Sequence, residues 1–125
     1  MRAGDTFFPI ARERLPHLWL VITSPGADRQ LAIVNVTTKR LGSDETCVLQ
    51  IGDHPFIRHD SVVLYEKAQT ADADDLEGAM VELHLEARTP LPPAVLARVQ
   101  SGALSSVFTP RGVKAMVRRE LGMAD

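Results

Sequence analysis

Two apolar segments that lie close together in the chain constrain the fold more strongly than any other feature. Residues 18–23 and 31–37 are almost entirely apolar and rich in β-branched side chains. Such runs are typical of strands that are buried on both faces. The connection between them begins with Ser24, Pro25 and Gly26, three residues that favour a turn. The sequence therefore predicts two neighbouring antiparallel strands at the centre of a sheet.

Other short segments add strands to this sheet. Residues 6–8, 46–49 and 61–65 are rich in apolar and β-branched side chains, and each is predicted to be a strand. Residues 79–86 alternate between two sets of side chains, which favours a last strand, although a helix is also consistent with the pattern. The acidic stretch over residues 72–77 is predicted to be a solvated loop.

The last third of the chain has helical periodicity. Pro92 and Pro93 stand where proline is tolerated, in the first turn of a helix, and Gly102 is a natural C-terminal stop. A second helix is predicted to start at Thr109 and Pro110, a capping residue followed by proline. The apolar stripe of this second helix consists of Val113, Met116, Val117 and Leu121.

These elements predict one domain over residues 1–125, mainly β with α-helices at its C-terminal end. The strands, at about residues 4–88, are expected to form a small, strongly bent antiparallel barrel. The helices, at about residues 92–122, are expected to be added to this barrel. The sequence shows neither the βαβ rhythm of a Rossmann-type fold nor a glycine-rich phosphate loop.

The charge balance limits the kinds of partner. The 125 residues include 14 Lys or Arg and 16 Asp or Glu, for a net charge of -2. Any phosphate site must therefore be a local cluster of cations. The single cysteine, Cys47, excludes an internal disulfide and a four-cysteine zinc site, and it suits a reducing compartment. Because the longest apolar run, residues 18–22, is too short to cross a bilayer, we predict a cytoplasmic protein without a membrane partner.

The order of these segments resembles that of the PemK/MazF toxin family. The similarity runs from residues 4–7 (Gly-Asp-Thr-Phe) through residues 18–25 and 31–38 to the strand at 61–66. It covers roughly residues 4–100, by pattern and spacing. The resemblance implies an SH3-like barrel that is usually dimeric. It also implies an enzyme that cleaves single-stranded RNA without a metal ion or another cofactor, and an antitoxin protein that neutralises it.

Several positions depart from the family's pattern. Where the family carries an Arg-Pro pair before the second strand, residues 16–17 read Pro-His, and Leu64 takes the place of a second arginine. The family's hydroxyl residue at the end of the third strand is matched by Thr37 or Thr38, and its later acidic residue by Glu66. These differences keep a second hypothesis open, namely a catalytically inactive SH3-like barrel that acts as a protein- or nucleic-acid-binding module.

The loop over residues 11–17 combines the side chains that metal-free RNA cleavage needs. Such cleavage requires a base for the 2′-hydroxyl proton, an acid for the leaving oxygen and a cation for the charge on the phosphate. Histidine can act as base or acid near neutral pH, and arginine suits phosphate. Arg12, Arg14 and His17 are therefore candidates, in a loop that forms part of the active groove in the family. A solvated polar loop is the alternative.

The segment over residues 52–61 contains two histidines, two aspartates, an arginine and a serine, and three interpretations of it remain open. In the first, Arg58 and His59 face a phosphate while Phe56 stacks on a base. In the second, the apolar side chains of residues 55–57 pack against the barrel and the aspartates bind turn amides. In the third, the segment holds a metal ion, although its spacing matches no strong zinc motif. The ligands would then be Asp53, His54, His59 and Asp60.

Together, the residues and the resemblance predict a metal-independent endoribonuclease that acts on single-stranded RNA in a toxin–antitoxin system, as a homodimer. No cofactor or metal ligand is included in this prediction. The predicted catalytic residues are Arg14, His17, Thr37 and His59. The predicted RNA-contacting residues are Arg12, Thr38, Phe56 and Arg58.

Overall fold

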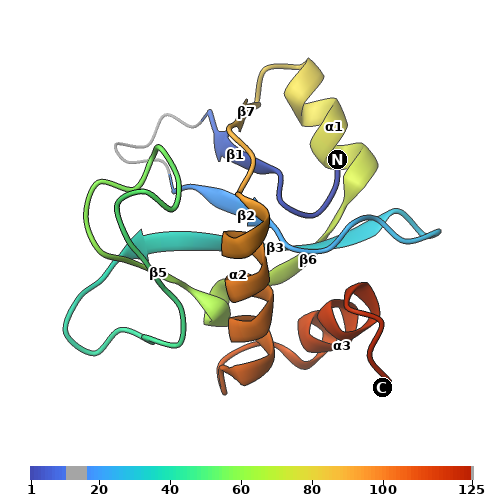
Figure 1. The fold of residues 1–125 in the computed structure, drawn as a ribbon. Helices are drawn as coiled ribbons and strands as arrows, with labels where there is room; N and C mark the ends of the chain where they lie inside the picture. Colours follow the sequence, from blue (N-terminus) through green and yellow to red (C-terminus); the bar gives the residue numbers. More distant parts are fainter. Residues whose placement is uncertain (11–16, 125) are drawn as a thin grey trace.

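The computed structural model describes residues 1–10 and 17–124. Within these residues, seven strands form one sheet and three α-helices pack around it (Figure 1). None of the described helices combines the length and the hydropathy needed to span a membrane. In chain order the elements are β1 (Thr6–Pro9), β2 (Trp19–Val21), β3 (Gln30–Thr38), β4 (Val48–Leu49), β5 (Ser61–Val63), the 3-10 helix η1 (Tyr65–Lys67), β6 (Gln69–Asp72), α1 (Ala73–Val81), β7 (Leu85–Arg88), α2 (Pro93–Ser105) and α3 (Arg111–Glu120).

The predicted central pair of strands is confirmed. β2 and β3 run antiparallel, with Trp19 opposite Asn35. β3 is nine residues long, and its other edge pairs with two strands in succession, β6 along residues 30–33 and β5 along residues 36–38. The strand order is β4-β5-β3-β2-β1-β7, with β6 beside β3. All of these pairings are antiparallel, so the predicted sheet class is confirmed.

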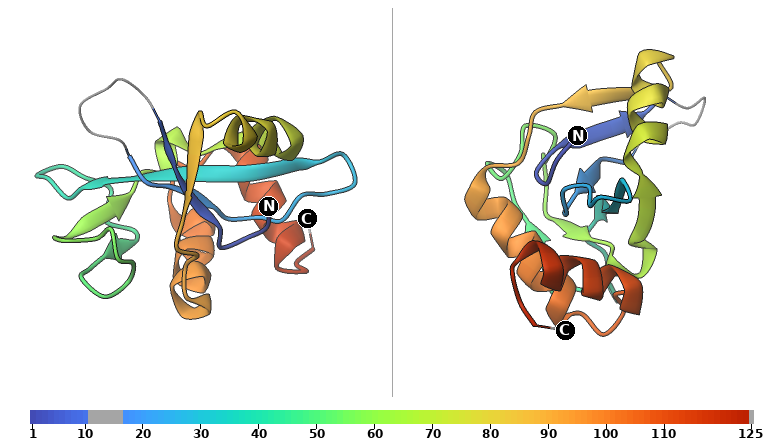
Figure 2. Two further views of the ribbon diagram at one scale, coloured as in Figure 1. Left: turned by 90° about the horizontal axis from the view of Figure 1, so that it is seen from above. Right: turned by 90° about the vertical axis from the view of Figure 1, so that its right-hand side faces the viewer.

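The described strands do not close into the predicted barrel. β4 and β7 end the strand order, and closure would require them to pair with one another. Instead, α2 lies across this side of the sheet (Figure 2). Its Arg98 donates to the carbonyl of Val48 in β4 at 2.7 Å. Just before α2, the Leu91 N–H donates to the Gly4 carbonyl beside β1 at 2.8 Å. A helix therefore covers the opening that a closed barrel would fill with strand pairing.

Alternating side chains on the central strands divide the interior into two apolar clusters. Leu20 and Val34 belong to the larger cluster, whereas Val21 and Ile33 belong to a smaller one beneath α1. This division follows from the two-residue period of a strand. The predicted C-terminal helices are confirmed, and their apolar stripes complete the larger cluster. They contribute Val95, Val99, Ala103, Val113 and Val117.

One helix occupies residues for which the sequence pattern predicted a loop and a strand. α1 covers most of the acidic stretch at 72–77, so the loop prediction is wrong there. In the alternating segment at 79–86, the helical alternative applies to the first three residues, and the strand β7 begins only at Leu85. The Asp72 carboxylate accepts the Asp75 N–H at 3.1 Å and caps the helix. Acidic side chains are favourable at this end of a helix. The face that meets the smaller cluster consists of Ala73, Leu76 and Met80.

The remaining strands differ from the predicted ones mainly in extent. β4 is confined to the last two of residues 46–49, and β5 to the first three of residues 61–65. After β5 the chain turns into η1, which places the Tyr65 side chain in the larger cluster. β6 carries no apolar run, and its pairing with β3 imposes the strand on it.

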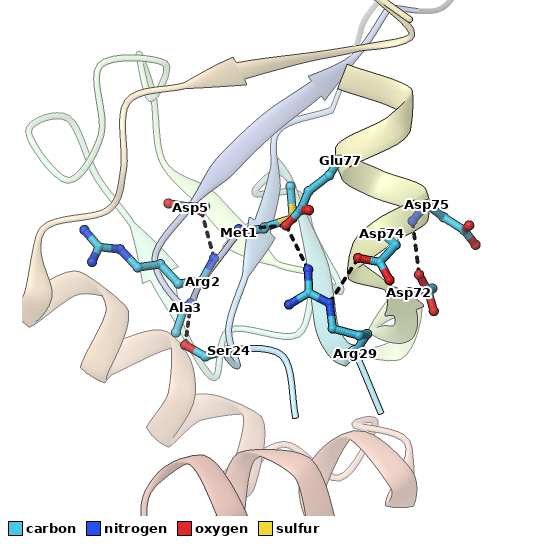
Figure 3. Close-up of polar contacts among 10 residues, drawn as sticks. All are labelled: Met1, Arg2, Ala3, Asp5, Ser24, Arg29, Asp72, Asp74, Asp75 and Glu77. Atoms are coloured by element: carbon cyan, nitrogen blue, oxygen red, sulfur yellow. Dashed lines mark hydrogen bonds and ion pairs between the residues drawn. The ribbon is translucent and has the colours of Figure 1, made fainter. Parts of the chain in front are cut away.

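A polar network ties α1 to the turn after β2 (Figure 3). Arg29, whose backbone φ is 63°, donates to Asp74 at 3.0 Å and to Glu77 at 3.1 Å. The amino group of Met1 donates to the same Glu77 carboxylate at 3.0 Å, and this bond is the main reason why the pKa of Glu77 is lowered. The network stabilises the start of β3, at the opposite end of this strand from the predicted site residues Thr37 and Thr38.

Candidate functional site

A cavity of about 310 Å³ opens at the C-terminal end of β3. Residues from three separate parts of the sequence line it. Six of the eight predicted site residues are among them, namely His17, Thr37, Thr38, Phe56, Arg58 and His59. Val36, Arg40 and Ser61 complete the lining. The other two predicted residues, Arg12 and Arg14, lie outside the described residues.

A second hollow, of about 320 Å³, lies between the turn at residues 23–30 and α3. Its charged side chains carry both signs, from Asp28, Arg119 and Glu120. The Glu120 carboxylate already accepts the Ser24 N–H at 2.6 Å. The cavity at the end of β3 is the better candidate site because it combines imidazole, hydroxyl and guanidinium groups.

The pairing of β3 with β5 positions His59. Thr38 lies opposite Ser61, and the Lys39 N–H donates to the Asp60 carbonyl at 3.0 Å. The Ser61 hydroxyl donates to the His59 carbonyl at 3.0 Å, and Thr38 Oγ1 lies 3.0 Å from His59 Nε2. A hydroxyl can donate to an imidazole nitrogen or accept from it, so this hydrogen bond can form whether or not Nε2 of His59 carries a proton.

His17 reaches the cavity from the segment before β2. Its Nδ1 lies 3.3 Å from the carbonyl oxygen of Val36, and the Val36 N–H donates to the Leu18 carbonyl at 3.0 Å. Because a carbonyl oxygen can only accept, the contact with Val36 requires the proton to be on Nδ1. In the neutral ring, Nε2 then carries a lone pair that can take a proton from a ligand.

Two arginines give the cavity its positive charge. Among the described residues, neither Arg40 nor Arg58 forms an ion pair. Lys39 differs, because its ammonium group forms a hydrogen-bonded ion pair with Glu45 at 3.0 Å. This contact offsets the positive charge of Lys39 and raises its pKa. Sequence reasoning missed Arg40, although its position shortly after the predicted strand over residues 31–37 was a usable signal. Both guanidinium groups are available to bind a phosphate.

Aromatic packing holds Phe56 at the cavity wall. Its ring meets Phe8 edge-on, with a centroid distance of 4.6 Å and an interplanar angle of 74°. The guanidinium carbon of Arg88 lies 5.1 Å from the centroid of the Phe8 ring. Phe56 is still 39% exposed, so part of its ring remains available to stack on a nucleobase.

His54 has a different role from the histidines of the cavity. It is only 3% exposed. Its Nδ1 accepts the Phe56 N–H at 3.0 Å, so the proton of the neutral ring is on Nε2, which donates to the Thr89 carbonyl at 2.7 Å. Burial is the largest cause that lowers the pKa of His54. The neutral ring therefore connects the loop to the segment after β7 and is part of the fold.

The four residues considered as metal ligands do not converge. Both ring nitrogens of His54 are bonded to the backbone, Asp53 forms an ion pair with Arg98 at 3.0 Å, and His59 lines the cavity. Within the part of the chain that the structure describes, no group of three or more His, Cys, Asp or Glu side chains is placed to hold a metal ion. The first half of the segment at 52–61 instead supports the fold, and its second half lines the cavity.

Two positions compared with the PemK/MazF pattern lie away from the cavity. Leu64 and Glu66 line a separate hollow of about 130 Å³, together with Phe108. Glu66, which matches the acidic residue of the family, is therefore not part of the candidate site. Arg40 and Arg58 line the cavity at the end of β3 and not this hollow.

No protein-family model matches this chain, and no curated protein matches it. The resemblance to the PemK/MazF toxins therefore stays a prediction, which rests on the order and spacing of the sequence segments. The cavity itself combines two imidazoles, two guanidinium groups and several hydroxyls. These groups are suited to bind a phosphodiester and to move protons at its oxygens.

Proposed function

We propose that this protein is a metal-independent endoribonuclease that acts on single-stranded RNA, as the resemblance to the PemK/MazF toxins implies. The observation that supports the proposal is the convergence of His17 and His59 with Arg40 and Arg58 on one cavity. Two imidazoles supply a base and an acid, and two guanidinium groups bind the phosphate. Each chemical requirement of RNA cleavage is thereby assigned to a side chain of this site.

His17 is the base in this proposal, because its Nε2 is the nitrogen with the free lone pair. It takes the proton of the ribose 2′-hydroxyl while the 2′ oxygen forms a bond to phosphorus. The bond from phosphorus to O5′ breaks, its electron pair stays on O5′, and His59 donates a proton to that oxygen. The products are a 2′,3′-cyclic phosphate and a 5′-hydroxyl. Arg40 and Arg58 stabilise the negative charge that develops on the phosphate.

The same proposal includes the architecture and the partners. The bent sheet is an opened SH3-like barrel of the PemK/MazF kind, and the pairing of one edge of β3 with both β6 and β5 supports this. A second copy of the chain, an antitoxin protein and a cytoplasmic location belong to the proposal as well. The thiol of Cys47, which is free and buried, is compatible with a reducing compartment.

The test is cleavage of a labelled single-stranded RNA by the purified protein in the presence of a chelator. We expect cleavage to continue and to yield 2′,3′-cyclic phosphate ends. An RNA with a 2′-deoxyribose at the cleaved nucleotide should resist cleavage, because the nucleophile is missing. His17→Ala and His59→Ala should each lower the rate about 100-fold or more. His84→Ala is the matched control, since its side chain is 71% exposed and does not line the cavity.

Two results would contradict the proposal. One is cleavage that the chelator abolishes, because this outcome would require a metal ion for the reaction. The other is full activity in the double variant of His17 and His59, which would place the cleavage elsewhere or in a contaminant.

A second candidate function is RNA binding without cleavage, and the observation that favours it is Leu64 in place of an arginine of the family. This function predicts that the protein binds a single-stranded oligonucleotide but forms no product, even at a large excess of protein. Phe56→Ala and Arg58→Ala should then weaken the binding, since one removes the stacking ring and the other a phosphate contact.

A further inference from the structure

β7 leaves one backbone edge uncovered. It pairs with β1 alone, and residues 86–88 are exposed. In line with the β1–β7 register, the Ile10 N–H donates to the His84 carbonyl at 2.8 Å, so this pair is at a hydrogen-bonded position of the ladder, although the His84 N–H donates to the Ala79 carbonyl instead. Hydrogen-bonded and non-hydrogen-bonded pairs alternate along an antiparallel ladder. Ala87, opposite Phe7, is therefore in a non-hydrogen-bonded pair, and its N–H and C=O point away from β1.

The other end of the sheet is protected, in contrast to β7. β4 has only two residues, and Arg98 of α2 donates to the outward carbonyl of Val48 at 2.7 Å. Short length and capped carbonyls both prevent pairing with a further strand. β7 has four residues, and no described residue hydrogen-bonds the outward groups of Ala87. Such an edge is a template for an additional strand.

The two charged residues that flank Ala87 are arranged so that one copy of β7 is complementary to a second copy of β7. Glu86 and Arg88 lie on the same face of β7 and form an ion pair at 2.9 Å. When two copies of β7 pair antiparallel around Ala87, Glu86 of each copy lies opposite Arg88 of the other. Opposite charges at such positions stabilise strand pairing, and a two-fold axis makes the two contacts identical. We propose that two copies of this chain associate through β7 and continue the sheet across a two-fold axis.

Exposed apolar side chains extend this surface at the start of β7. Val81, Leu83 and Ile10 are 83%, 74% and 54% exposed. Leu83 also has a backbone φ of 63°, a conformation that is costly for any residue with a branched side chain. In the proposed register, this end of β7 lies beside Pro90 of the second copy, so that the association covers part of the apolar surface.

The pairing surface is connected to the candidate site by two aromatic rings. Arg88 packs over Phe8, and Phe8 packs edge-on against Phe56 at the cavity wall. Association through β7 therefore holds Arg88 in place and, through the two rings, the wall of the cavity. The inference rests on the second copy that the proposed function includes and specifies the surface through which it binds. The association does not depend on RNA cleavage, so that cleavage and the β7 contact can fail separately.

Charge reversal tests the proposed contact. Glu86→Arg places arginine opposite arginine, and Arg88→Glu places glutamate opposite glutamate. In sedimentation equilibrium, we expect each variant alone to dissociate with a constant about tenfold or more above that of the wild type. An equimolar mixture of the two variants should form a heterodimer, because unlike charges then face each other at both positions. Both variants have lost the ion pair within the chain, which mixing cannot restore, so recovery identifies a contact between copies.

A backbone substitution tests the same edge independently. Ala87→Pro removes an N–H that points outward and leaves the ladder with β1 intact. We expect it to shift the protein to monomer. Val48→Pro is the matched control at the protected edge, where the N–H also points outward, and it should leave the assembly unchanged. Circular dichroism verifies that each variant is folded.

Three outcomes would overturn the proposal. The first is a wild-type protein that stays monomeric up to about 1 mM. The second is a dimer that neither charge reversal weakens, which would place the interface on another surface. The third is a mixture of the two charge variants that does not associate, which would limit the role of Glu86 and Arg88 to the ion pair within one chain.

Discussion

His54 and His59 belong to the same loop and have opposite surroundings. His54 is buried, and both of its ring nitrogens bind backbone groups. His59 is exposed at the cavity, and its ring contacts the hydroxyl of Thr38. The first ring holds the fold together in its neutral form, whereas the second can exchange a proton with a ligand. Burial and hydrogen-bond partners, rather than the residue type, decide what a histidine does here.

The largest expected effect separates the two histidines by activity. His59→Ala should lower the rate of RNA cleavage about 100-fold or more, because the proposed acid of the reaction is lost. The unfolding temperature should change by less than about 3 °C, as is usual for an exposed side chain. Single-turnover cleavage and thermal unfolding measure the two quantities. If His59→Ala lowered the unfolding temperature as much as a His54 variant does, the two histidines would not differ in their contribution to the fold.

The next effect separates them by stability. His54→Ala should lower the free energy of unfolding by about 2–4 kcal/mol, since it leaves a cavity and deprives the Phe56 N–H of its partner. The Thr89 carbonyl keeps the Thr6 hydroxyl, which donates to it at 2.7 Å. Urea denaturation measures the loss. Cleavage per folded molecule should stay near the wild-type rate, and a stable but inactive His54→Ala would reverse the two roles.

The pH dependence of stability sharpens the comparison. Because burial lowers the pKa of His54, the folded protein resists a proton that the unfolded chain accepts near its ordinary pKa of about 6.5. Above that pH the ring is neutral in both the folded and the unfolded chain, so it adds no pH dependence to the stability. As the pH falls below it, the protein should lose up to about 1.4 kcal/mol per pH unit until the folded-state pKa is reached.

Two glutamine variants assign this pH dependence to its source. His54→Gln should remove the loss, and His59→Gln should retain it. Urea denaturation at about pH 5 and about pH 7.5 compares them. The same loss in both variants would show that another group is responsible.

The smallest expected effect is at the hydroxyl that contacts His59. Thr38→Val should lower the rate of cleavage by about tenfold or less, because His59 loses a hydrogen-bond partner. Thr38→Ser keeps the hydroxyl and should retain the rate. If valine and serine behave alike, the contact between Thr38 and His59 has no part in the reaction.

Local patterns in the sequence predict some elements well and others poorly. The β2–β3 pair follows from two apolar runs, and α2 and α3 follow from apolar residues at helical spacing with proline before them. α1 is harder, because its acidic first turn is typical of a solvated loop as well as of a capped helix. β6 has no pattern of its own and becomes a strand because β3 lies beside it.

The candidate site could be predicted in its parts but not as a whole. Most lining side chains are chemically distinctive, and the sequence identifies them as candidates. Their convergence depends on the register that pairs Thr38 with Ser61, which brings the loop of His59 to the end of β3. Arg40 was missed because the sequence does not show which of the neighbouring cations Lys39 and Arg40 pairs with Glu45; in the described part of the chain it is Lys39.

By itself, the sequence determined the central antiparallel strands and the two C-terminal helices. It also determined that, in a chain with a net charge of -2, any phosphate site must be a local cluster of cations. These properties depend on composition and on periods of two or 3.6 residues. Only the tertiary structure decided that α2 covers the opening of the sheet, that β7 is an open edge, and that His54 and His59 differ. Each of these depends on burial and on contacts between residues far apart in the chain, which no local pattern contains.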